Sequence, residues 1–149
     1  MSAATGNTVF YASASMGRKL TGLALVANES FSPRDDLDRA RGVFVRPEHK
    51  LLGQSYVGRV LVLDTAVGGL ASAWTLQEMT ALGMRPAALV LNAVSAIMVQ
   101  GAALADFTMI SGFNCDITGA IPSGAVVEVD PTGARPFIRI IDTNTMAPR

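Results

Sequence analysis

Three short apolar runs without polar alternation constrain the fold of this chain more than any other feature. They read Val-Leu-Val-Leu at 60–63, Ala-Leu-Val-Leu at 88–91 and Thr-Met-Ile at 108–110. Runs of this kind are typical of parallel strands that are covered on both faces of a sheet. Two helical stretches, roughly Leu70–Leu82 and Ser95–Ala105, separate them. The order β-α-β-α-β predicts right-handed crossovers and a small parallel sheet.

Further strands are predicted on both sides of this unit. An apolar segment at Leu23–Val26 precedes it, and a short strand is expected at Gly42–Val45 before Pro47. After Pro122, two runs at 125–129 and 137–141 flank a Pro-Thr-Gly turn, which predicts a hairpin. The expected fold class is therefore α/β with a mixed sheet.

The length of 149 residues fits one domain. Residues 1–21 are rich in Ser, Ala, Gly and Thr and are predicted to form a mobile N-terminal arm. The remainder, 22–149, contains no linker and is expected to be a single domain. Residues 1–21 also lack the apolar region of a signal peptide.

Composition excludes several classes of protein. Twelve basic and twelve acidic side chains cancel, so nothing favours nucleic acid or an anionic membrane as a partner. No apolar stretch reaches the roughly 18–20 residues of a membrane span. The single cysteine, Cys115, cannot form an intrachain disulfide and agrees with a cytoplasmic location. Half of the residues are hydrophobic and only 16% are charged, which predicts apolar surface for a partner or an oligomer.

Metal ligands are scarce. One Cys and one His cannot supply a structural zinc site, and three cysteines for an iron–sulfur cluster are lacking. We expect Cys115 to be a small buried thiol and His49 to be a solvated loop histidine. The acidic run Asp35-Asp36 with Asp38 is expected to be a solvated turn balanced by neighbouring arginines. One of these arginines, Arg34, is alternatively a residue that binds a substrate carboxylate.

A glycine turn follows the first apolar run and leads into the first helix. It contains Thr65, Gly68 and Gly69. Two glycines let backbone N–H groups approach a ligand, and a helix start adds partial positive charge, so the turn could hold an anion beside the Thr65 hydroxyl. The alternative is a tight strand-to-helix connection that needs glycine for steric reasons alone. The turn matches neither the dinucleotide fingerprint nor the P-loop. Ser72 lacks the flanking glycines of a nucleophile elbow and is expected to pack or bond back to its helix.

Five segments, taken in order, resemble the small, swivelling-domain subunit of aconitase X. The likeness extends from about Gly22 to Ile141, and the segments lie at 29–38, 53–62, 65–69, 99–102 and 121–130. The phrase Phe31-Ser32-Pro33-Arg34, the two glycines and the following Trp74 resemble the cis-3-hydroxy-L-proline dehydratase branch. The phosphomevalonate dehydratase branch carries a serine-rich turn, and 66–71 of this chain lacks those serines.

The resemblance implies a swivelling β/β/α domain and a large aconitase X partner chain that holds an iron–sulfur cluster. It implies an active site closed between the two chains and a hydro-lyase that dehydrates a small hydroxy acid, cis-3-hydroxy-L-proline, to pyrroline-2-carboxylate. On this hypothesis Thr65 is the catalytic base and the N–H groups around Gly68 and Gly69 hold the substrate carboxylate. Ser32 and Arg34 are further candidates for substrate contact. The alternatives are a dehydratase subunit for another hydroxy acid, such as phosphomevalonate, and a non-catalytic assembly module.

Overall fold

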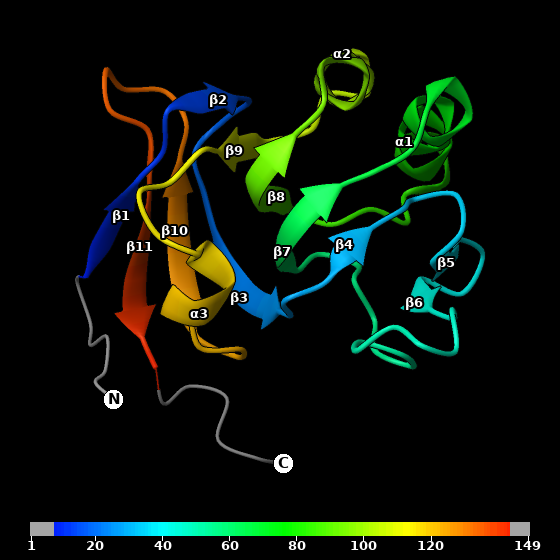
Figure 1. Cartoon of the computed structure of the whole chain (residues 1–149), viewed down its shortest axis with the longest axis horizontal. Helices are drawn as coiled ribbons and strands as arrows, with labels where there is room; N and C mark the ends of the chain where they lie inside the picture. Colours follow the sequence, from blue (N-terminus) through cyan, green and yellow to red (C-terminus); the bar gives the residue numbers. More distant parts are fainter. Residues whose placement is uncertain (1–7, 144–149) are drawn as a thin grey trace.

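A computed structural model describes residues 8–143 of the chain. Within this range one nine-stranded sheet has the order β1-β11-β10-β3-β7-β8-β9-β2, with β4 paired to β7, and a separate two-stranded sheet joins β5 to β6 (Figure 1). The strands are β1 (Val9–Tyr11), β2 (Ala14–Met16), β3 (Leu20–Val26), β4 (Ser30–Phe31), β5 (Leu37–Asp38), β6 (Val43–Phe44), β7 (Val60–Ala66), β8 (Ala88–Val94), β9 (Met109–Ser111), β10 (Val126–Asp130) and β11 (Phe137–Asp142). The helices are α1 (Leu70–Leu82), α2 (Ala96–Leu104) and α3 (Ile117–Ala120).

The predicted parallel unit is confirmed. Strands β3, β7, β8 and β9 are parallel neighbours, and helices α1 and α2 connect β7 to β8 and β8 to β9. Helix α1 begins and ends where the sequence predicts. It ends at Leu82 because Gly83 adopts the left-handed conformation that terminates a helix. Helix α2 begins after Ser95, whose side chain accepts the N–H of Met98.

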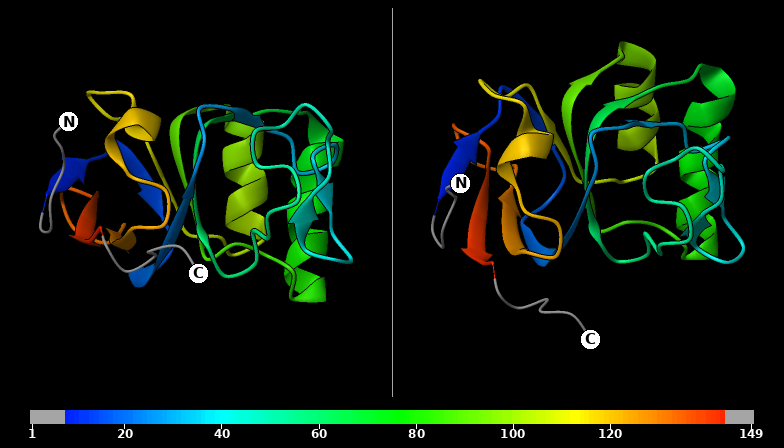
Figure 2. Two further views of the ribbon diagram at one scale, coloured as in Figure 1. Left: turned by 90° about the horizontal axis from the view of Figure 1, so that it is seen from below. Right: turned by 60° about the horizontal axis from the view of Figure 1, so that its bottom comes forward.

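The second half of the sheet is antiparallel. Strand β10 pairs with β11 in the predicted hairpin and with β3 on its other side, so β3 joins the two halves. The parallel strands lie between helices α1 and α2 on one side and the antiparallel strands with α3 on the other (Figure 2). The α/β class with a mixed sheet is therefore confirmed.

Side chains of the central strands point alternately to the two faces of the sheet, so the core consists of two clusters. Leu61 and Leu63 of β7 belong to the cluster beneath the helices. Val60 and Val62 belong to a second cluster with the antiparallel strands. All four side chains are completely buried, which explains why these strands lack polar alternation.

The predicted N-terminal arm is wrong for residues 8–21. Strand β1 pairs with β11, strand β2 pairs with β9, and β3 already begins at Leu20. Residues 1–7 lie outside the described range. Three-residue edge strands take their stability from the neighbouring strand's backbone rather than from their own hydrophobicity, so a composition rich in Ser and Ala concealed them.

The described residues, 8–143, include no helix both long enough and apolar enough to traverse a membrane.

Candidate functional site

Strands β4 and β7 end side by side and define one edge of the sheet. Their register pairs Ser30 with Thr65 and Phe31 with Ala66. The N–H of Val67 continues the contact by donating to the Phe31 carbonyl at 2.8 Å. The residues after both strands, and the start of α1, therefore meet at the carboxyl end of parallel strands, where open α/β sheets bind ligands.

Thr65 lies in β7 immediately before this edge. Alternation places its side chain on the same strand face as Leu61 and Leu63, towards the helices. The side chain is half-buried, and its hydroxyl makes no hydrogen bond to any residue in 8–143. The hydroxyl is thus available to a ligand, as the proposed base must be.

The two glycines differ in their surroundings. Gly68 has φ of 128°, and a Cβ there would lie 2.1 Å from the Ser72 hydroxyl oxygen, so glycine is sterically required. Gly69 is the N-cap residue of α1 with φ of −102°, and a Cβ there would meet nothing within 4 Å. Ser72 is buried and packs against the turn, in agreement with its predicted structural role.

Helix α1 begins without compensation of its positive end. Within the described residues no side chain caps it, and its first turn contains no acidic residue. Its first N–H groups therefore remain available at the helix end that attracts anions.

Ser32 and Arg34 occupy the turn after β4 and differ in availability. The Ser32 hydroxyl is engaged with Asp35, since it lies 3.3 Å from a carboxylate oxygen and accepts the Asp35 N–H at 3.2 Å. Arg34 is exposed, and among residues 8–143 its guanidinium has neither a hydrogen bond nor an ion pair. Arg34 is the better placed of the two to bind a substrate group directly.

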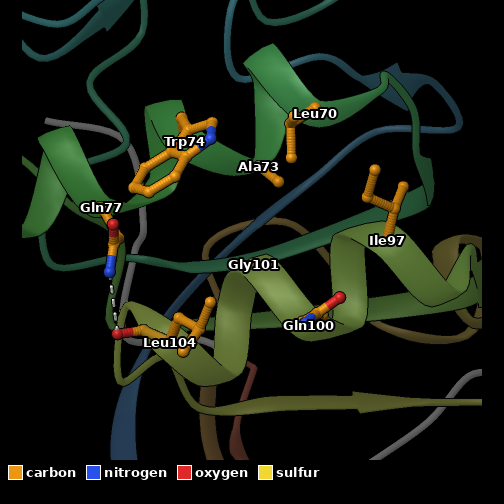
Figure 3. Close-up of a pocket in the computed structure, with 8 residues that line it drawn as sticks. All are labelled: Leu70, Ala73, Trp74, Gln77, Ile97, Gln100, Gly101 and Leu104. Carbon is orange, nitrogen blue, oxygen red and sulfur yellow. Dashed lines mark hydrogen bonds between the residues drawn. The ribbon is translucent and has the colours of Figure 1, made fainter.

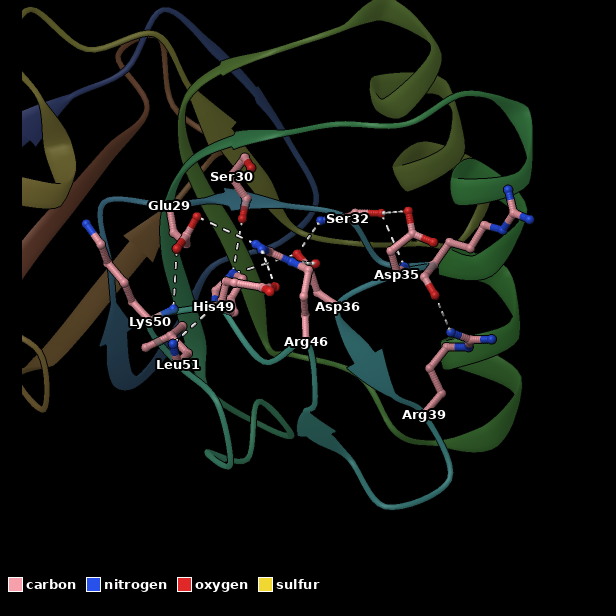
Figure 4. A network of polar contacts seen from close by, with 12 residues as sticks. Glu29, Ser30, Ser32, Asp35, Asp36, Arg39, Arg46, His49, Lys50 and Leu51 are labelled. Carbon is pink, nitrogen blue, oxygen red and sulfur yellow. Dashed lines mark hydrogen bonds and ion pairs between the residues drawn. The ribbon is translucent and has the colours of Figure 1, made fainter.

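Asp36 and His49 were predicted to be solvated, and the structure shows that both are buried. Asp36 is buried and accepts from Arg46 Nε at 2.5 Å and from the Ser32 N–H at 2.8 Å (Figure 4). The His49 side chain is 0% exposed and stacks on Phe44 with a ring separation of 4.6 Å. Hydrogen bonds compensate both groups for burial, and the Arg46 charge additionally compensates Asp36.

Cys115 is exposed, so the prediction of a buried thiol is wrong. Asp116, the next residue, caps α3 by accepting the Thr118 N–H, and Ile117 then takes the buried position. The capped turn therefore leaves Cys115 at the surface.

A polar network at the same edge escaped sequence analysis. Asn92, at the end of β8, donates to Asp64 at 3.0 Å and to Asp116 at 2.8 Å, and Asn28 donates to Asp116 at 3.1 Å. The Thr118 hydroxyl, followed by Asn92, holds the pKa of Asp116 below its usual value. Asp64 and Asn92 lie on the sheet face opposite Thr65. Their position as the first polar residues after two buried runs is the signal that could have revealed them.

Within residues 8–143 no group of three or more His, Cys, Asp or Glu side chains is arranged to hold a metal ion. The described part of the chain therefore offers no cluster-binding set of its own.

A groove between α1 and α2 carries the three most exposed large apolar side chains of the two helices. Leu70, Trp74 and Leu104 are 64%, 60% and 65% exposed. The groove is lined by Leu70, Ala73, Trp74, Gln77, Ile97, Gln100, Gly101 and Leu104 (Figure 3). The helices approach closely at Gly101, where a Cβ would lie 2.6 Å from that of Ala73. Leu70 immediately follows Gly69, so this apolar face is continuous with the candidate site.

Comparison with known proteins identifies the family. The architecture defines a swivelling domain that presents a glycine turn at a sheet edge. Residues 9–138 match the aconitase X swivel domain, and the chain belongs to that family. The predicted resemblance to aconitase X is thus confirmed.

Named relatives and solved structures agree with this assignment. The chain is 32% identical to the phosphomevalonate dehydratase small subunit of Methanopyrus kandleri over 109 residues, covering 73% of this chain and 81% of that protein. It is 27% identical to the protein of the same name from Thermococcus sibiricus, covering 76% and 85% of the two chains. The fold matches the crystal structure of Thermococcus kodakaraensis aconitase X with a TM-score of 0.82 at 20% identity, covering 91% and 99%. A UPF0107 protein solved by NMR matches with a TM-score of 0.75 at 24% identity, covering 91% and 100%.

Proposed function

We propose that this chain is the small subunit of a two-chain hydro-lyase whose substrate binds at the ends of β4 and β7 and the start of α1. The main support is that Thr65 and the start of α1 lie on one short stretch of chain at this edge. Among residues 8–143 the Thr65 hydroxyl has no hydrogen-bond partner, and no side chain caps the start of α1. Family membership and the names of the relatives support the same assignment.

The first candidate substrate is cis-3-hydroxy-L-proline. The N–H groups around Gly68 and Gly69 bind its carboxylate, as helix N-termini bind anions. Thr65, as alkoxide, removes the proton from the carbon that bears the carboxylate. The neighbouring hydroxyl leaves with a proton as water, and the resulting enamine tautomerises to pyrroline-2-carboxylate.

This chemistry needs positive charge from groups around the substrate. A free hydroxyl is a weak acid, so ionised Thr65 requires the positive end of α1 and cations from the partner chain. An iron–sulfur cluster held by that partner, and not by residues of this chain, would supply Lewis-acid activation of the departing hydroxyl.

The second candidate substrate is phosphomevalonate, which the names of the relatives favour. Residues 66–71 contain no serine and no cationic side chain. A phosphate group at this turn would therefore depend on Arg34 or on the partner chain for its positive charge.

One experiment separates these candidates. The chain is purified alone and after co-expression with a large aconitase X chain, and iron content and turnover of both substrates are measured. We expect iron and activity only in the complex, with cis-3-hydroxy-L-proline as the better substrate. Preference for phosphomevalonate would establish the second candidate. An iron-loaded complex inactive on both would favour the assembly module.

The apolar face of α1 and α2 is proposed to contact the large subunit, because it borders the site that the partner closes. Trp74→Gln should weaken the affinity for the large subunit at least about 30-fold, as for a buried interface tryptophan worth roughly 2 kcal/mol. The melting temperature of the free chain should hardly change, since Trp74 is 60% exposed.

Ile141→Gln is the matched control for this substitution. Ile141 is also apolar and is 39% exposed, but it belongs to β11, which lies on the opposite side of the molecule from α1 and α2 (Figure 1). Equal affinities of both variants for the large subunit would exclude the helix face as the contact.

A further inference from the structure

We infer that His49 and Asp36 are positioning residues that complete the outer edge of β4 and thereby fix the candidate site. The inference rests on the proposed function for its catalytic consequence, and on geometry alone for the structural part.

The hydrogen bonds of β4 point alternately to its two sides. The carbonyls of Glu29 and Phe31 accept N–H groups of Asp64 and Val67, at 2.9 and 2.8 Å, and so face β7. Ser30 and Ser32 therefore direct their backbone groups away from β7. A further strand would satisfy these groups in a longer sheet.

Side chains take the place of that strand. His49 Nε2 lies 3.1 Å from the Ser30 carbonyl oxygen, and an Asp36 carboxylate oxygen accepts the Ser32 N–H at 2.8 Å (Figure 4). Both side chains are buried, so the two contacts are shielded from water.

The tautomer of His49 follows from its neighbours. Nδ1 accepts the N–H of Leu51 at 3.1 Å and therefore carries no proton. Nε2 faces the Ser30 carbonyl, with an Asp36 oxygen at 3.7 Å, and both are acceptors. The imidazole is consequently neutral with its proton on Nε2, and it donates to β4.

The surrounding loop holds this donor in place. Arg46 bonds to Asp36, the His49 N–H donates to the Arg46 carbonyl at 3.0 Å, and the imidazole stacks on Phe44. This series of contacts fixes the position of Ser30 relative to the buried loop. Ser30 is in turn in register with Thr65. Loss of the Nε2 contact should loosen β4 and displace the end of β7.

Two substitutions each preserve one half of the imidazole contacts. In His49→Gln the amide N–H can still donate to the Ser30 carbonyl, whereas in His49→Asn the amide oxygen can accept only the Leu51 N–H. Both variants lose one hydrogen bond and the aromatic stacking. They therefore form a matched pair that differs in which contact survives, the one to β4 through Ser30 or the one to Leu51 within the loop.

The variants are compared in the complex with the large subunit and as the full chain. We expect His49→Asn to lower kcat at least about 10-fold with little change in KM, because small misplacements of reacting groups are costly. His49→Gln should stay within about threefold of wild type by the same argument. Amide exchange of Asp64 and Val67 should accelerate in His49→Asn and remain slow in His49→Gln.

Each possible result either supports or overturns the positioning role of His49. Equal kcat in the two variants, with equally reduced melting temperatures, would reduce His49 to a core residue. Should His49→Asn not fold, slow exchange of Asp64 and Val67 in His49→Gln still supports the inference, and fast exchange overturns it. Should wild-type complex be inactive on both substrates, the exchange pattern still tests the edge of β4, while the proposed function fails by itself.

Discussion

Thr65→Ala is expected to leave the two-chain complex assembled and to lower turnover at least about 100-fold, the usual effect of removing a general base. The Thr65 hydroxyl makes no hydrogen bond to residues 8–143, so its removal breaks no contact there. Substrate affinity should change little, because the carboxylate is assigned to the glycine turn. The measurement is kcat and KM of the purified complex.

Two further substitutions at this position separate the hydroxyl from the shape of the side chain. Thr65→Ser keeps the hydroxyl and should retain part of the activity. Thr65→Val keeps the branched shape that suits a strand, lacks the hydroxyl, and should be as inactive as the alanine variant. Turnover close to wild type in Thr65→Val would transfer the base role elsewhere, first to the large chain.

The parallel unit could be predicted from sequence because its signals are local. Val60–Leu63 and Ala88–Leu91 are apolar without interruption since both sheet faces are covered. Gly83 and Ser95 mark helix boundaries through their own backbone conformation and side-chain bond. Each of these signals can be read from a few neighbouring residues, without knowing which distant residues cover the strands.

The failures concern residues whose environment is set by distant parts of the chain. His49 reads as a loop histidine until Ser30, nineteen residues earlier, is placed against its Nε2. Strand β1 is stabilised by β11, which lies at the opposite end of the sequence. Charge balance also misled the prediction for Asp36, because this carboxylate is buried and pairs with Arg46, which lies outside the acidic run.

The spatial grouping of the candidate residues could be predicted in part, whereas their roles stay predictions. Thr65, Gly68 and Gly69 lie within five consecutive residues, so a strand-to-helix turn was sufficient to group them. The parallel pairing of β4 with β7 then adds Ser32 to the same edge, although its hydroxyl serves the turn with Asp35. Asn92 and Asp116 join through α3, a four-residue helix that has no strong sequence signal.

Gly68→Ala is expected to destabilise the chain strongly. The new methyl group would lie 2.1 Å from the Ser72 hydroxyl oxygen and 2.4 Å from Ser72 Cβ, in a backbone conformation with φ of 128°. The backbone strain alone costs about 1–3 kcal/mol. A large fall in melting temperature should result. The double variant Gly68→Ala, Ser72→Gly removes the clash and should recover part of this loss, with the strain remaining.

Gly69→Ala provides the clean test of the anion site. Its φ of −102° lies outside the left-handed region and its Cβ would meet nothing within 4 Å, so the fold should tolerate the added methyl group. A methyl at the N-cap would obstruct a carboxylate approaching the first N–H groups of α1. We expect substrate affinity to fall about 10-fold or more, the equivalent of one hydrogen bond to a charged group. Titration in the Thr65→Ala complex measures this affinity without turnover. Unchanged affinity there would leave Gly68 as a steric requirement of the turn and move the carboxylate to Arg34 or to the partner chain.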